Sequence, residues 1–116
     1  MRNPVKGLRI STATVNDQPV VRVSGEVDLR TSPQLREALL RVAQKGPDRL
    51  IIDLAEVDYM DSSGVGTMVE LKRVVERRDG RLVLVNLQPR VRSVFEVTQL
   101  DRFFDIAADL NEATRQ

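Results

Sequence analysis

Hydrophobic and polar positions change their period several times along the chain, and each change predicts an element. Apolar or β-branched residues alternate with polar ones over 8–15 and again over 20–24. Between them, residues 16–19 read Asn-Asp-Gln-Pro, which is a turn signal. Alternation on both sides of a turn predicts an antiparallel β-hairpin. Residues 25–29 then predict either a loop or a continuation of the second strand.

Helical spacing of apolar residues predicts three amphipathic helices. The first begins at 31–33, where a capping residue precedes a proline, and ends near 45–47. The second runs from about Ser62 to Arg77, and Gly80 suits the left-handed position that closes a helix. The third begins at 88–89. Its inward-facing residues are expected to be Val91, Val94, Phe95 and Val97.

Short apolar runs between these helices predict further strands. Arg49–Leu54 is the most apolar run and is typical of a buried parallel strand, and Arg81–Asn86 and Phe103–Ala107 follow. A last helix is expected over Leu110–Arg115. Strands joined through helices need crossovers, which make them parallel. The prediction is an α/β fold, a mixed β-sheet with an N-terminal antiparallel hairpin and helices packed on it, as one domain over 1–116.

Composition removes several classes of function. Cysteine and histidine are absent, which excludes a thiol nucleophile, a zinc–thiolate site and a histidine-based triad. The 18 basic and 17 acidic residues are spread along the chain, which argues against nucleic-acid binding. Residues 1–7 are polar, expected to be frayed, and followed by no long apolar run. We therefore expect a cytoplasmic protein without a signal peptide, a membrane span, a metal or a cofactor.

One segment combines capping and hydroxyl residues at a helix start. Asp61-Ser62-Ser63-Gly64 is expected where a loop after the buried strand turns into the second helix. The carboxylate of Asp61 is a good N-cap for the amide of Ser63 or Gly64. The helix dipole would also tolerate negative charge on Ser62. By itself this segment indicates only a helix cap.

Carboxylates also gather after two predicted strands. Asp53, Asp58 and Asp61 follow one strand, and Glu26 and Asp28 follow another. Such acids can form a metal site or the phosphoaspartyl acceptor of a receiver-like domain. They can equally be caps and solvated loop ends, which the pattern favours, since no lysine follows a late strand as a receiver would require.

Several segments together resemble one known family. Residues 57–66 (Val-Asp-Tyr-Met-Asp-Ser-Ser-Gly-Val-Gly) resemble the signature of the STAS domain, named for sulfate transporters and anti-sigma factor antagonists. Residues 25–28, 50–54 and 80–86 follow the family's order. The resemblance implies a mixed sheet with helices mainly on one side. Single-domain length and an intact Asp-Ser-Ser-Gly are most similar to the bacterial anti-sigma factor antagonists.

This resemblance implies a partner switch rather than an enzyme with catalytic residues. The unmodified antagonist binds an anti-sigma factor, which is also a serine kinase with a histidine-kinase-like ATPase fold, and a sigma factor is freed. The kinase phosphorylates the serine that matches Ser62, the antagonist dissociates, and a serine phosphatase reverses the modification. The surround of Ser62 and the partner interface are expected to comprise Asp28, Asp58, Asp61, Ser63, Gly64 and Val65.

Two alternatives remain open from the sequence. The chain could be a STAS scaffold or transport-accessory subunit that stays in a stable complex. It could also be a receiver or flavodoxin-like domain that uses Asp53 or Asp58.

Overall fold

The strands form one mixed sheet in the order β1-β2-β3-β4-β5. The computed structural model describes residues 7–115, so the expected frayed start lies outside the described residues except for Gly7. The N-terminal pair is antiparallel, and each later strand is parallel to its neighbour. The strands are β1 (Arg9–Val15), β2 (Gln18–Val27), β3 (Arg49–Met60), β4 (Arg81–Val85) and β5 (Asp105–Ala107). The predicted mixed sheet with an N-terminal hairpin is confirmed.

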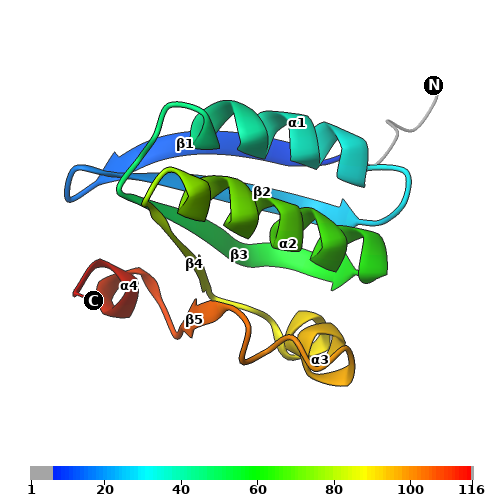
Figure 1. Ribbon diagram of the computed structural model, residues 1–116. Coiled ribbons are helices and arrows are strands. Elements are labelled where there is room, and N and C mark those ends of the chain that lie inside the picture. Colours follow the sequence, from blue (N-terminus) through cyan, green and yellow to red (C-terminus); the bar gives the residue numbers. More distant parts are fainter. Residues whose placement is uncertain (1–6, 116) are drawn as a thin grey trace.

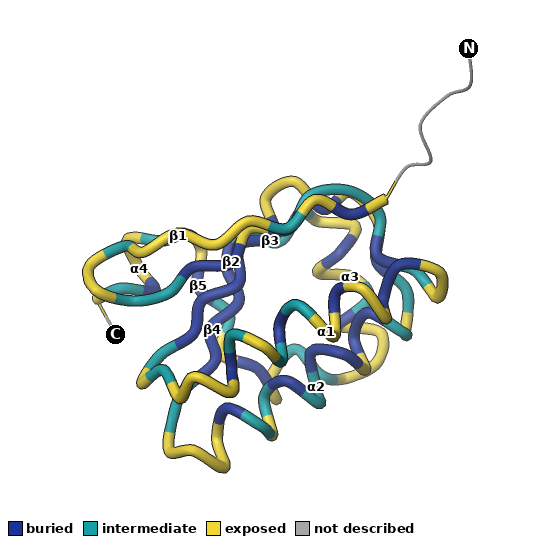
Figure 2. The backbone as a smooth tube through the Cα atoms, turned by 90° about the horizontal axis from the view of Figure 1, so that it is seen from above, coloured by how far each residue is buried: buried dark blue, intermediate teal, exposed yellow. Residues whose placement is uncertain are grey.

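Helices lie mainly on one face of this sheet. α1 (Ser32–Ala43), α2 (Ser62–Arg77) and α3 (Pro89–Val97) share the larger core, whereas α4 (Leu110–Arg115) covers the opposite face (Figure 2). The smaller core behind α4 consists of Val20, Ile51, Val83, Val85, Ala107 and Ala113. Within the described residues, no helix combines the length and apolar character that a membrane crossing requires.

The hairpin turn and the start of α1 follow from local chemistry. Asn16 and Asp17 both have positive φ, and Val15 pairs with Gln18, so the loop is a tight two-residue turn. α1 begins at Ser32 as predicted. The hydroxyl of Thr31 does not cap it, however, and instead donates to Glu26 O at 2.8 Å.

β3 is longer than the expected strand, which ended at Leu54. It continues to Met60, so that a strand and not a loop leads into α2. Its pairing with β2 shifts register twice, between Arg22 and Ser24 and between Gly25 and Glu26. Each shift is a bulge that places one extra residue on β3. The buried residues are therefore Leu54, Val57 and Met60, at a spacing that the two-residue period of a regular strand does not predict.

Two expectations about helix ends were wrong. Asp79 has φ 62° and is the left-handed residue after α2, whereas Gly80 is not in that conformation. A Cβ on Gly80 would lie 2.5 Å from Pro47 O, so the glycine permits a close approach of the backbone instead. Val97, expected to face inward, is 82% exposed at the end of α3, while Val91 and Phe95 are buried.

Candidate functional site

The candidate site lies at the edge of the sheet where β2 and β3 end. α1 and α2 begin at this same edge, at the right of Figure 1. The two connections are joined directly, because the amide of Asp61 donates to Val27 O at 3.1 Å. The carboxyl ends of parallel strands are where functional loops gather in α/β sheets. The Asp61–Gly64 segment and the β2–α1 turn therefore form one continuous surface.

Asp61 caps α2, as predicted, and it also binds a hydroxyl. Its Oδ1 accepts from the amide of Ser63 at 2.9 Å and from the hydroxyl of Ser63 at 2.5 Å. Ser63 O in turn accepts from Thr67 Oγ1 at 3.0 Å. Because a carboxylate makes charge-assisted hydrogen bonds, this arrangement orders the first turn of α2. The Ser63 hydroxyl is thereby committed to a structural contact.

Ser62 differs from its neighbour in both exposure and bonding. Its side chain is exposed on the first turn of α2. Among the described residues, no hydrogen bond involves its hydroxyl, whereas the Ser63 hydroxyl is partly buried and bonded. The positive end of the helix dipole favours negative charge at this position. Of the two serines, Ser62 is therefore the one whose hydroxyl an external enzyme can reach.

Gly64 and Val65 were expected in the partner interface, but they lie beneath the surface. A Cβ on Gly64 would be 2.6 Å from Met60 Cγ and 2.7 Å from Val27 Cγ1. The glycine therefore lets the start of α2 approach the ends of β2 and β3. The side chain of Val65 is 3% exposed in the main core. These residues support the exposed first turn, and the Val65 side chain is turned away from any partner.

Asp28 organises the turn between β2 and α1. Its Oδ1 accepts from the amides of Arg30 at 2.9 Å and Thr31 at 3.0 Å, and Arg30 forms an ion pair with it. The amide of Ser32 donates to Asp28 O at 2.8 Å. Burial acts to raise the pKa of Asp28, but the hydrogen bonds from Thr31 and Arg30 outweigh it, so the pKa lies below its usual value. Asp28 is thus a carboxylate that holds its turn in one conformation.

The edge that carries Ser62 is acidic. Carboxylates from both strand ends gather there, and Asp58 is exposed on β3. Within residues 7–115, Arg30 pairs with Asp28 and no other ion pair involves this group. The acidic residues are Glu26, Asp28, Asp58 and Asp61. A phosphate on Ser62 would add further negative charge to this group of carboxylates.

Sequence reasoning missed the exposed apolar side chains at this edge. Leu29, within the β2–α1 turn, is 78% exposed, and Tyr59, paired with Glu26 across β2 and β3, is 41% exposed. A signal was available for Leu29, since it is an apolar residue between Asp28 and Arg30 in a polar turn. Exposed apolar groups beside a polar site are typical of interaction surfaces.

Asp53 does not join this site. It is 7% exposed, in the central part of β3. The residues before it are buried on both faces of the sheet, since Ile51 belongs to the smaller core and Ile52 to the larger one. Its Oδ1 accepts from Asn86 Nδ2 at 3.1 Å and from the amide of Ala55 at 3.0 Å, and Arg22 lies 3.5 Å from Oδ2. The described residues contain no group of three acidic side chains that could hold a metal ion. The convergence of Asp53 with Asp58 and Asp61, the less favoured of the two interpretations of the sequence, is therefore not found among the described residues.

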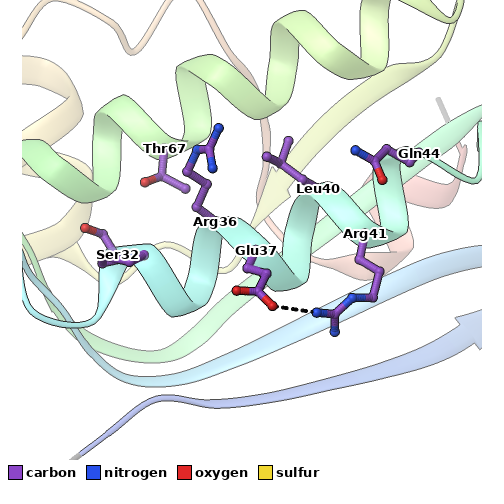
Figure 3. A pocket seen from close by; sticks show the side chains of 8 residues that line it. Ser32, Arg36, Glu37, Leu40, Arg41, Gln44 and Thr67 are labelled. Carbon is purple, nitrogen blue, oxygen red and sulfur yellow. Dashed lines mark hydrogen bonds and ion pairs between the residues drawn. The ribbon is translucent and has the colours of Figure 1, made fainter.

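A pocket runs along α1 from Ser32 to Gln44, and Thr67 of α2 also lines it (Figure 3). Ser32 and Thr67 line its end nearest the site, and Arg36 and Arg41 lie farther along α1. Arg36 is bound by Glu70, and Arg41 is paired with Glu37. Both arginines are thus neutralised within the chain, and the pocket does not present the free positive charge that an anion site needs.

Sequence comparison places the chain among bacterial regulators. The model of the STAS domain family matches residues 9–113. The anti-sigma-B factor antagonist of Bacillus subtilis (strain 168) is 41% identical over 88 residues, which cover 76% of this chain and 80% of that protein. The anti-sigma-B factor antagonist of Staphylococcus epidermidis is 36% identical over 93 residues, covering 80% of this chain and 86% of that protein.

Solved structures agree with this result. A crystal structure of an anti-sigma factor antagonist from Mycobacterium paratuberculosis matches with a TM-score of 0.85 at 28% identity, covering 93% of this chain and 92% of that chain. The Bacillus protein SpoIIAA, at 28% identity, matches with a TM-score of 0.76 unphosphorylated and 0.69 phosphorylated, covering 92% of this chain and 95% and 98% of those chains. With the family model matching residues 9–113, the chain belongs to the STAS domain family.

Proposed function

We propose that this protein is an anti-sigma factor antagonist that binds an anti-sigma factor when unmodified and releases it when Ser62 is phosphorylated. The anti-sigma factor is then also the serine kinase, and a serine phosphatase restores the binding form. The relatives reported above are named as antagonists, which supports this role over that of a scaffold in a stable complex. No chemistry by the chain's own residues is part of the proposal.

The observation that carries the proposal is the contrast between adjacent serines. Ser62 is exposed and its hydroxyl makes no hydrogen bond within residues 7–115, while the Ser63 hydroxyl is bound at 2.5 Å by Asp61. A serine modified by another enzyme needs no internal base, but it must be reachable. Because Asp61 already fixes the helix start, modification of Ser62 breaks no hydrogen bond among the described residues.

Phosphorylation would act at the surface rather than through the core. A phosphate adds a charge of about −1.5 to −2 at neutral pH. The dipole of α2 stabilises that charge by about 0.3–1 kcal/mol, so little internal rearrangement is expected. In a complex the same charge would sit beside Asp61 in the contact area and would have to be desolvated. A loss of about 3 kcal/mol in this way lowers affinity by about a hundredfold.

The experiment is a pull-down from native lysate of the source organism with matched baits. The baits are the wild type, Ser62→Ala, Ser62→Asp and, as a control at the adjacent position, Ser63→Ala. Captured proteins are identified by mass spectrometry, and the intact mass of each bait reveals added phosphate. We expect an anti-sigma factor with an ATPase-type kinase domain on every bait except Ser62→Asp.

Two other outcomes of the pull-down would contradict the proposal. Recovery of the same large assembly by all baits, Ser62→Asp included, would favour the scaffold or transport-accessory alternative. Loss of the kinase from Ser62→Ala would mean that the serine hydroxyl is itself part of the contact, and the charge-based switch would then be wrong.

A further inference from the structure

Leu29 is the most exposed large apolar side chain at the Ser62 edge. It is 78% exposed and lies in the β2–α1 turn, two residues after Val27. Val27 O accepts the hydrogen bond from the Asp61 amide. The exposed large apolar side chains among the described residues are Leu29, Tyr59, Val97 and Phe103. The first of these lies in the turn that follows β2, and the second lies near the end of β3.

The turn that carries Leu29 is ordered by its own hydrogen bonds. Asp28 Oδ1 accepts from two amides, and the Thr31 hydroxyl donates to Glu26 O at 2.8 Å. Leu29 itself adds no burial to this turn, since most of its side chain faces outward. Because these hydrogen bonds fix the backbone of the turn, a partner that covers Leu29 has to order only its side chain. The backbone is thus preorganised for binding, although the fold gains little from the apolar character of Leu29.

We propose that Leu29 is an affinity anchor that inserts into an apolar pocket of the anti-sigma factor. The occupant follows from continuity with the Ser62 edge, because the hydrogen bond from the Asp61 amide to Val27 O at 3.1 Å ties the start of α2 to the strand end that leads into the Leu29 turn. An apolar pocket also accounts for release, because its walls offer no hydrogen bonds to a phosphate introduced nearby on Ser62. This inference rests on the proposed function and names the contact that the switch disrupts.

The experiment measures the affinity of the purified anti-sigma factor, identified by the pull-down above, for matched variants. Leu29→Ser removes the anchor, and Leu29→Met keeps an apolar side chain of similar volume. Val97→Ser is the control, since Val97 is 82% exposed on α3 and α2 lies between it and the Leu29 turn. Dissociation constants come from titration calorimetry, and melting temperatures verify that each variant folds.

We expect Leu29→Ser to weaken binding by about 10- to 100-fold, as truncation of a central apolar contact does. Leu29→Met and Val97→Ser should stay within about threefold of the wild type, and all variants should melt close to it. In phosphorylation assays Leu29→Ser should raise KM and leave kcat nearly unchanged, because Leu29 does not touch the reacting hydroxyl.

Three results would overturn this inference. If Leu29→Ser binds as tightly as the wild type, Leu29 is not an anchor, and the proposed function stands without it. An equal loss in Val97→Ser would show a non-specific effect of surface polarity. If the wild type binds no anti-sigma factor at all, the proposed function fails first and the anchor fails with it.

Discussion

The side chain of Asp61 binds Ser63 twice, through its amide at 2.9 Å and its hydroxyl at 2.5 Å, and so separates two adjacent serines into different roles. One hydroxyl belongs to the helix cap, while that of Ser62 stays exposed on the first turn. The two serines of this Asp-Ser-Ser-Gly segment are therefore not equivalent in the folded protein.

This asymmetry predicts the site of modification. Incubation with the captured kinase and ATP should add one phosphate to the wild type and to Ser63→Ala, and none to Ser62→Ala. Intact mass and peptide mapping check the result. Phosphate on Ser63 in the wild type would contradict the assignment, because the hydroxyl would then have to leave Asp61.

Removal of the cap should destabilise the fold. Asp61→Ala deprives the Ser63 amide and hydroxyl of their acceptor, and we expect the free energy of unfolding to fall by about 1–2 kcal/mol. Urea denaturation followed by circular dichroism measures this change. Asp58→Ala, at an exposed position on β3, is the control and should stay within about 0.5 kcal/mol of the wild type. Equal losses in both variants would argue against a specific capping role.

The glycines of α2 should respond to alanine in opposite directions. A Cβ on Gly64 would meet Met60 and Val27 below 3 Å, so Gly64→Ala should destabilise the protein by about 1–3 kcal/mol. A Cβ on Gly66 meets nothing within 4 Å, and Gly66→Ala should stabilise by up to about 1 kcal/mol through helix propensity. Thermal and urea unfolding compare the two variants directly. A destabilised Gly66→Ala would mean that α2 is packed differently from the arrangement described here.

Asp53 should matter for stability and not for switching. Asp53→Ala leaves Asn86 Nδ2 and the amide of Ala55 without their acceptor, which should cost about 1–3 kcal/mol. Binding of the anti-sigma factor and phosphorylation should survive at temperatures where the variant is folded. Loss of phosphorylation in a folded Asp53→Ala would instead revive the receiver-like alternative.

A salt bridge between α1 and α2 predicts a pH dependence. Arg36 binds Glu70 through two hydrogen bonds of 2.7 and 2.6 Å, and these lower the pKa of Glu70 in the folded state. The pair therefore stabilises the fold above the usual pKa of a glutamate, and this contribution is lost as the pH falls through the lowered pKa. Both side chains are substantially exposed, so we expect only about 0.5–1 kcal/mol.

The contribution of the Arg36–Glu70 ion pair to stability can be measured by comparing two variants. Glu70→Gln should flatten the acid side of the stability profile between about pH 5 and pH 3. Glu37→Gln, whose partner Arg41 is on the same helix and is more exposed, should change the profile less. Identical profiles for Glu70→Gln and the wild type would mean that the pair contributes nothing measurable.

Regular elements could be predicted from the sequence, and irregular ones could not. The helices begin where Pro33, Asp61 and Pro89 indicate, because caps and prolines act locally. The second half of β3 was missed because its bulges replace alternation by the spacing of Leu54, Val57 and Met60. Capping chemistry predicted that Asp61 would bind the amide of Ser63 or Gly64, but the exposure of Tyr59 follows from the bulged pairing of β3 with β2, which no local pattern encodes.

The two bulges of β3 have a consequence for which changes in chain length the protein tolerates. In each bulge two exposed residues of β3, 55–56 in one and 58–59 in the other, stand where a regular strand has one, so Val57 and Met60 still face the core. Deletion of one residue from either pair would therefore remove a bulge and leave the inward side chains in phase with β2. Deletion of Val57 would instead take an inward side chain out of the core. Length variants that differ by a single residue within either exposed pair should therefore keep the fold and lose only the local bend of the strand.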